Sequence, residues 1–201
     1  ELTSDKATAF MEQGSPSAFA IGRRVGAEYA WAAPTWSLTA TVFGHNLQGL
    51  NDGRGFGLRG TWLARRDDEG FLHLGASWAH ESPDSHVGRF SARPEAALAS
   101  RRLVDTGNLA GVDSIDRAGL EAAWVHGPWL LQSEYLRGAF ARDVGDYAAG
   151  GWYAQGTWFP FGQQRSYKNG AIDAPKVADG APAIELGLRY SDLDLDDGAV
   201  R

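Results

Sequence analysis

Most of this chain alternates apolar or small residues with polar or charged residues at every second position. The pattern is clearest in residues 115–137, where two alternating arms flank a tight turn at 126–128. In the first arm Leu120 and Trp124 share one parity, whereas Glu121 has the other. Because a strand sends successive side chains to opposite faces, each arm has one apolar face and one polar face. The segment therefore predicts a β-hairpin.

The same alternation recurs along the chain and predicts about eight strands in all. Besides the two arms of the hairpin, the predicted strands are residues 20–31, 36–45, 56–65, 72–79, 151–159 and 184–191. No helical stripe of comparable strength is present. Possible shorter strands are 8–11, as a strand end, and 87–93, within the longest connection, 82–114.

The connections mostly alternate between short and long. The turns at 32–35, 66–70 and 126–128 are short, whereas long connections follow the strands at 36–45 (residues 46–55) and 72–79. Short turns at one end and long loops at the other are typical of outer-membrane β-barrels. The connection at 160–182 breaks this rhythm, and either an extra short hairpin or an elongated turn accounts for it.

A soluble β-sandwich also alternates, so three further features favour a barrel. Aromatic residues recur at strand ends on the apolar face, as they do in membrane-interface girdles. Those faces carry much Ala and Gly, which fill a sandwich core poorly. Charged residues also occupy mid-strand positions on the polar face, which a water-filled lumen accepts. The predicted interface aromatics are Trp31, Trp36, Trp62, Trp78, Trp124, Trp129, Tyr135 and Trp158.

The composition excludes several classes of protein but does not by itself identify the fold. The 201 residues include 26 Gly, 8 Trp and no Cys, which excludes disulfides and cysteine nucleophiles. There is no run of about 18 apolar residues, so no transmembrane helix is predicted. The net charge of −6 argues against a nucleic-acid binder. Neither a metal-binding motif nor a hydrolase motif is present, and we predict no enzyme activity and no cofactor.

Several blocks of the chain resemble one protein family. The blocks include ELTSDKATAFMEQGSPSAFAIGRRVG, FLHLGASWAHE, AGLEAAWVHGPWLLQSEYLR, GGWYAQGTWFPFGQQRSYKNGA and IELGLRYSDLDL. In this order they look like the phosphate- and polyphosphate-selective porins, the O and P porins. The resemblance implies a sixteen-stranded, homotrimeric barrel of the Gram-negative outer membrane that contacts its lipid and passes phosphate or other small anions.

The chain also departs from this family. It has about half of the family's length and lacks the final strand with its terminal aromatic residue. Where the family often has a basic residue after a Met-Glu pair, this chain has Gln13. We therefore expect residues 1–201 to be a single porin domain that is incomplete at both ends, with about 8–10 strands of an antiparallel transmembrane β-barrel.

Arginines on the polar strand faces are the candidate residues for anion passage. An arginine stays charged and offers a planar fork to phosphate oxygens. Several moderate sites in series conduct better than one strong site. The candidates are Arg24, Arg59, Arg117 and Arg189, with Lys168 near a mouth. In the alternative for each arginine, a glutamate such as Glu28, Glu121 or Glu185 pairs with it and braces the wall.

The sequence thus predicts an outer-membrane porin with a passive, anion-selective channel. Two alternatives remain open at this stage. One is a porin of the same fold with general or different selectivity, and the other is a soluble β-sandwich used for binding or adhesion.

Overall fold

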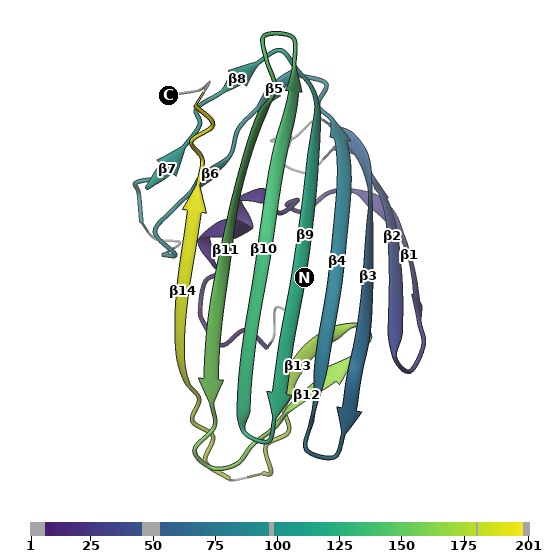
Figure 1. Cartoon of the computed structure of the whole chain (residues 1–201), viewed down its shortest axis with the longest axis vertical. Coiled ribbons are helices and arrows are strands. Elements are labelled where there is room, and N and C mark those ends of the chain that lie inside the picture. Colours follow the sequence, from purple (N-terminus) through teal and green to yellow (C-terminus); the bar gives the residue numbers. More distant parts are fainter. Residues whose placement is uncertain (1–6, 46–52, 97–98, 180, 199–201) are drawn as a thin grey trace.

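The computed structural model describes residues 7–45, 53–96, 99–179 and 181–198, and most of them form a single curved wall (Figure 1). The wall is one antiparallel eight-stranded sheet in the order β1-β2-β3-β4-β9-β10-β11-β14. Its strands are β1 (Gly26–Ala32), β2 (Trp36–Phe43), β3 (Arg54–Asp67), β4 (Gly70–Ser82), β9 (Val112–His126), β10 (Trp129–Arg142), β11 (Tyr147–Trp158) and β14 (Leu186–Asp194). The all-β prediction is confirmed, and within the described residues the antiparallel sheet does not close into a barrel, since β1 and β14 are open edges.

The predicted strand positions hold, with corrections at the bounds. The strands predicted at 56–65 and 72–79 are longer, because β3 and β4 continue to the turn between Asp67 and Gly70. The strand predicted at 20–31 begins only at Gly26. Its partner β2 ends at Phe43, so residues 20–24 have no ladder to join among the described residues. The prediction placed Arg24 in a strand, and this placement is wrong because Arg24 precedes β1. The predicted long connection at 46–55 lies mostly outside the described residues.

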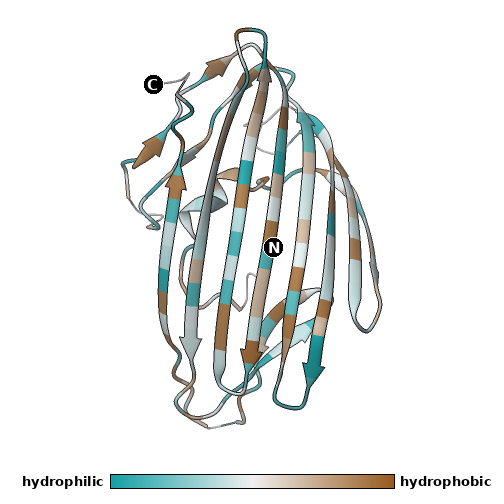
Figure 2. Ribbon diagram, in the orientation of Figure 1, coloured by the Kyte–Doolittle hydropathy of each residue, from teal (hydrophilic) through white to brown (hydrophobic). Residues whose placement is uncertain are grey.

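The outer face of the sheet is apolar and open. Its exposed side chains include Tyr29, Leu38, Leu58, Leu120, Leu131 and Leu188, which are 44–80% exposed. Figure 2 shows brown, hydrophobic bands that recur along the long strands. A sandwich would bury this face against a second sheet, and in the described residues no second large sheet covers it. The soluble-sandwich alternative is therefore wrong, and the face suits lipid contact.

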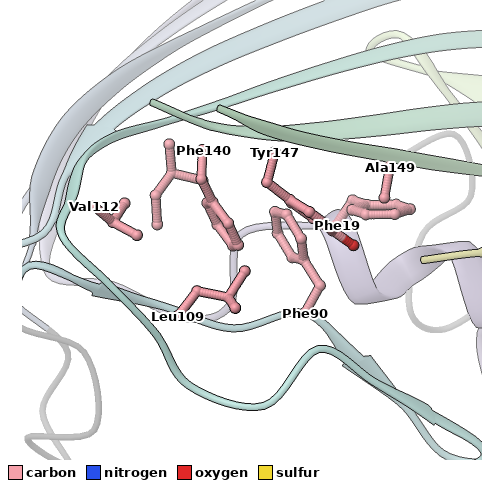
Figure 3. Close-up of a cluster of buried hydrophobic side chains, with 8 residues drawn as sticks. Phe19, Phe90, Leu109, Val112, Phe140, Tyr147 and Ala149 are labelled. Atoms are coloured by element: carbon pink, nitrogen blue, oxygen red, sulfur yellow. The ribbon is translucent and has the colours of Figure 1, made fainter. Parts of the chain in front are cut away.

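The N-terminal residues and the longest connection cover part of the inner face instead. The chain forms a short 3-10 helix, η1 (Ser15–Phe19), and no strand forms at 8–11. The possible strand at 87–93 is two short pieces, β5 (Val87–Gly88) and β6 (Ser91–Ala92), which pair with β8 (Leu109–Ala110) and β7 (Val104–Asp105). Figure 3 shows the resulting cluster of Phe19, Phe90, Leu109, Val112, Phe140, Tyr147 and Ala149. Each of these strands pairs over only two residues, and the segment between β5 and β6 carries Phe90, which packs on the wall.

A second hairpin fills the irregular connection between β11 and β14. It consists of β12 (Arg165–Lys168) and β13 (Ala171–Pro175), joined by Asn169 and Gly170 with φ of 50° and 80°. Two positive φ values in a two-residue loop define the turn that Asn-Gly favours. Of the two alternatives for 160–182, the extra hairpin is correct. The hairpin is a separate two-stranded sheet and adds no strand to the wall. It packs on the inner face instead, where Ile172 contacts residues of β3, β4, β9 and β10.

No helix in the described part of the chain has the length and apolarity needed to cross a bilayer.

Gly138 in β10 lies directly beneath the Phe90 and Phe19 rings. A Cβ atom there would lie 2.4 Å from Phe90 Cζ and 2.7 Å from Phe19 Cδ1. We expect Gly138→Ala to lower the free energy of unfolding by about 1–3 kcal/mol through overpacking. Gly60→Ala is the matched control, because a Cβ at Gly60 meets no atom within 4 Å. Urea unfolding of the protein in lipid vesicles measures both, and equal stabilities would contradict this packing.

Candidate functional site

The candidate site is the inner face of the sheet, where polar side chains from several strands surround a cavity of about 700 Å³. Strand register brings these side chains into rows: Arg59 lies between Thr39 and Ser77, and Glu121 lies opposite Glu134. The charged residues that line the cavity are Glu12, Glu28, Arg59, Arg117, Glu121, Glu134 and Arg189. Three of the four predicted lumen arginines therefore line one space, and Arg24 does not.

Arg59 connects the wall to the inner hairpin. Its Nη2 donates to Glu121 Oε1 at 2.5 Å and to the Gly170 carbonyl oxygen at 2.9 Å. His73 Nε2 lies 3.0 Å from the same Glu121 oxygen, and His73 Nδ1 lies 2.7 Å from the Tyr167 hydroxyl. Because a carboxylate only accepts hydrogen bonds, Nε2 carries the proton, and in the neutral ring Nδ1 accepts from Tyr167. Glu121 thus holds the position of the hairpin through two different donors.

Arg24 and Arg117 share one carboxylate. Arg117 Nη1 donates to Glu81 Oε2 at 2.7 Å, and Arg24 Nη2 donates to Glu81 Oε1. The Glu81 side chain is only 4% exposed, and the arginines are 6% and 15% exposed. Glu81 lies near the end of β4, which is a central strand of the sheet. The contact therefore fastens the segment before β1 to a central strand. Glu81 was not among the predicted partners, although its parity with Ser77 and Ala79 places it on the inner face.

Arg189 is bound to segments that are distant in the sequence. Its Nη2 donates to Glu95 Oε2 at 2.6 Å, its Nη1 donates to the Glu12 carbonyl oxygen at 2.8 Å, and its guanidinium lies 4.5 Å from the centre of the Phe10 ring. Glu95 also accepts the Ser15 N–H at 2.8 Å. Strand parity gives no signal for Glu95, because the residue lies in the irregular connection 82–114.

The Glu95 carboxyl has a pKa below its ordinary value of 4.5. Burial by itself raises this pKa, and donors that include the Ser15 N–H and the Arg189 guanidinium lower it by more. A carboxyl with a lowered pKa in the folded state stabilises the fold above its unfolded pKa, and this stabilisation is lost as the pH falls through the folded value. The contact between Arg189 and Glu95 is therefore intact at neutral pH.

Arg165, the first residue of β12, is a buried cation inside the wall. The residue is 4% exposed. Its Nη2 donates to both Glu185 carboxylate oxygens, at 2.6 and 2.8 Å, and its Nη1 donates to the Ala7 carbonyl oxygen. Burial of an arginine requires such a partner because an unpaired buried charge is costly. Lys168, three residues later, is exposed at the end of β12.

All four predicted lumen arginines are therefore in ion pairs with glutamates. The partners are Glu81 for Arg24 and Arg117, Glu121 for Arg59, and Glu95 for Arg189. Only Glu121 belongs to the set of partners considered from the sequence. Such pairs fix the position of each guanidinium and compensate much of its charge, so the inner wall offers arginine N–H groups with weakened net attraction for anions.

The predicted interface aromatics all lie on the outer face and are exposed. The exposed fractions are 40% for Trp31, 47% for Trp36, 55% for Trp62, 41% for Trp78, 40% for Trp124, 49% for Trp129, 46% for Tyr135 and 36% for Trp158. Cross-strand pairs form within this set, since the Trp31 and Trp36 rings lie 3.8 Å apart and the Trp129 and Trp158 rings 5.4 Å apart. Register also places Tyr135 opposite Trp152.

Comparison with known proteins gives consistent matches. The model of the family described as phosphate-selective porin O and P matches residues 1–201. An uncharacterized protein of Caulobacter vibrioides is 30% identical over 221 residues, covering 100% of this chain and 45% of that relative. Porin O of Pseudomonas aeruginosa is 27% identical over 173 residues, covering 72% of this chain and 38% of the relative. The chain thus spans less than half the length of these two relatives.

Proposed function

Because the chain belongs to the phosphate-selective porin O and P family, we propose that it forms part of the wall of a channel that passively admits phosphate-like anions. The family is one of porins of the outer membrane, so the protein is a channel component and not an enzyme. Anion selectivity, the route of the ion and the assembly of the barrel are the parts that we propose.

One observation carries the proposal of anion passage. Arg59, Arg117 and Arg189 line a single cavity on the polar face of a sheet whose other face is apolar. Guanidinium groups recognise phosphate oxygens through N–H groups in a fixed plane. Their ion pairs keep them in place and moderate their attraction, which suits transit because a strong site would trap the ion.

The outer aromatics support the placement in a membrane. Trp124, Trp129 and Trp158 gather near the ends of β9, β10 and β11 beside the short turns, whereas Tyr135 lies farther along β10. Porin barrels carry such aromatics at the two lipid–water interfaces. We therefore propose that the eight predicted aromatics contact lipid headgroups, and that the complete protein is a homotrimer, as in the family it resembles.

A porin of the same fold with different selectivity is the second candidate. Four glutamates, Glu12, Glu28, Glu121 and Glu134, line the same cavity as the three arginines. A lumen with this charge balance has no strong field of one sign along this part of the wall, and the other part of the barrel then sets the selectivity.

A selectivity measurement separates these candidates. For the full-length protein in a planar bilayer under a KCl gradient, we expect a chloride-selective zero-current potential and a current that added phosphate reduces. Arg59→Gln is expected to lower the anion-to-cation permeability ratio by about fivefold, because it removes a lumen charge and frees Glu121. Arg137→Gln is the control, since Arg137 is exposed and shares the outward parity of Tyr135. A cation-selective or unselective wild-type potential would contradict the anion proposal and favour the second candidate.

A further inference from the structure

Arg137 differs from the arginines of the inner face because it stands on the outer, apolar face of the sheet. It lies in β10, in the middle of the wall (Figure 1), and shares the parity of Leu131 and Tyr135, which are both exposed. The Arg137 side chain is exposed, and across the described part of the chain it takes part in no ion pair. A cation on the lipid-facing side of a barrel is costly near the bilayer midplane and tolerated near the interfaces. Its depth in the membrane therefore matters.

The depth of Arg137 follows from its position along β10. Arg137 comes eight positions after Trp129, which begins β10 beside the short turn. With a rise of about 3.3 Å per residue and a tilt of about 40°, these positions span about 20 Å along the membrane normal, and the apolar band of a porin is about 25 Å tall. Arg137 therefore lies near the margin of that band at the long-loop end. Because the long loops of such barrels face outward, this is the level of the outer-leaflet headgroups.

Small residues beside Arg137 leave room for a ligand at its guanidinium. Strand register places Ala118 of β9 and Gly150 of β11 directly opposite Arg137. A Cβ atom at Gly150 would lie 3.0 Å from the Tyr135 hydroxyl oxygen, so this hydroxyl lies beside the residue that Arg137 faces. We call the site formed by Ala118, Tyr135, Arg137 and Gly150 the outer notch. It offers a cation and a hydroxyl over a floor of small side chains.

Two carboxylates lie near the outer notch in the strand register. Asp116 is diagonal to Arg137 across β9 and β10, and it already pairs with His80, whose Nδ1 is 3.1 Å from Asp116 Oδ1. Asp194 lies opposite Gly150 on the far side, in β14, which is two strands from Arg137. Neither carboxylate forms an ion pair with Arg137. The guanidinium thus keeps its charge for a partner outside the sheet.

Toward the short-turn end, the outer face beside the notch is apolar. Leu120 in β9 and Leu131 in β10 are both more than half exposed there. The surface is therefore polar and cationic at the level of headgroups and apolar below it. This order of chemistry matches an amphipathic ligand with an anionic head and acyl chains.

From these observations we propose that the outer notch binds the phosphate group of a lipid in the outer leaflet. The guanidinium donates from its planar fork to the phosphate oxygens, and the Tyr135 hydroxyl donates a further hydrogen bond. The acyl chains lie along the exposed leucines. The inference rests on the proposed placement in a membrane and adds to it a lipid class and a binding site on the face opposite the channel.

Native mass spectrometry of the full-length protein in detergent, with diphosphoryl lipid A as the probe, measures this binding. We expect Arg137→Gln to lower the retained lipid A about tenfold, because charge-assisted hydrogen bonds are lost, and Tyr135→Phe to lower it about threefold. Arg137→Lys keeps the charge without the fork and is expected to give an intermediate loss. The control is Arg101→Gln, which removes an exposed charge from the connection 82–114 and should retain lipid A as the wild-type protein does.

Lipid A without its phosphates separates the headgroup from the acyl chains. The wild-type protein should retain this lipid about ten times less than the phosphorylated form. Equal retention of the two lipids, or equal retention of lipid A by Arg137→Gln and Arg101→Gln, would overturn the proposal. A wild-type zero-current potential that is not anion-selective would contradict the proposed function and leave lipid retention unaffected, so the two failures are distinct.

Discussion

Glu81→Gln is expected to lower the free energy of unfolding by about 3–5 kcal/mol, because it leaves two buried cations without a carboxylate. Arg24 and Arg117 both donate to this carboxylate, and Arg24 Nε, Arg24 Nη1 and Arg117 Nε already lack hydrogen-bond partners in the structure. A neutral amide offers one acceptor oxygen to two guanidinium groups. The loss is expected to release the segment before β1 first, since Arg24 fastens that segment to the sheet.

Glu28→Gln is the matched control, because it changes the same residue type on the same face of the sheet. Glu28 lies in β1, is exposed, and forms no ion pair within the described residues. Its substitution is expected to change stability by less than about 0.5 kcal/mol. Urea unfolding in lipid vesicles, followed by tryptophan fluorescence, compares the two variants. Equal losses would mean that Glu81 does not compensate Arg24 and Arg117.

The wall could be predicted from the sequence because its strands keep a period of two over most of their length, with register shifts only near the ends of β3 and β10. Once one apolar residue is placed, such as Trp124 in β9, the face of every other residue in that strand follows. The parity that puts Leu120 outward puts Glu121 inward, and the structure confirms both. The irregular parts had no such constraint. Phe19, Phe90 and the short strands around them are positioned by packing on Phe140, which no local pattern reports.

The partners of the arginines were the least predictable feature, for a related reason. Parity shows which face Arg59 or Arg189 occupies, but not which carboxylate lies within reach. Glu121 was among the partners considered from the sequence, and a full strand register would have added Glu81, because both residues lie on regular strands. Glu95 lies in an irregular connection, and Glu185 pairs with a hairpin residue whose position depends on tertiary contacts. The Asn169-Gly170 turn is a local signal for the hairpin, but its docking on the inside of the wall depends on tertiary contacts of Ile172 and Tyr167.

Ile172→Asp is expected to release the hairpin β12–β13 from the wall while the strands stay paired. Ile172 is fully buried against Leu63, Phe71, Val125 and Leu130. Losing its burial costs about 1.5–3 kcal/mol, and a buried carboxylate adds several more. A change of about 4 kcal/mol shifts the docked-to-undocked ratio about a thousandfold. We expect larger single-channel conductance and faster trypsin cleavage after Lys168 and Lys176 in the purified full-length protein.

Ala171→Asp separates the loss of docking from the added charge. Ala171 adjoins Ile172 in β13 but has the opposite parity, so an aspartate there adds the same charge without entering the apolar cluster. This control is expected to keep the cleavage rate of the wild-type protein. Wild-type conductance and cleavage in Ile172→Asp would show that the polar contacts of Arg59 and Tyr167 hold the hairpin alone.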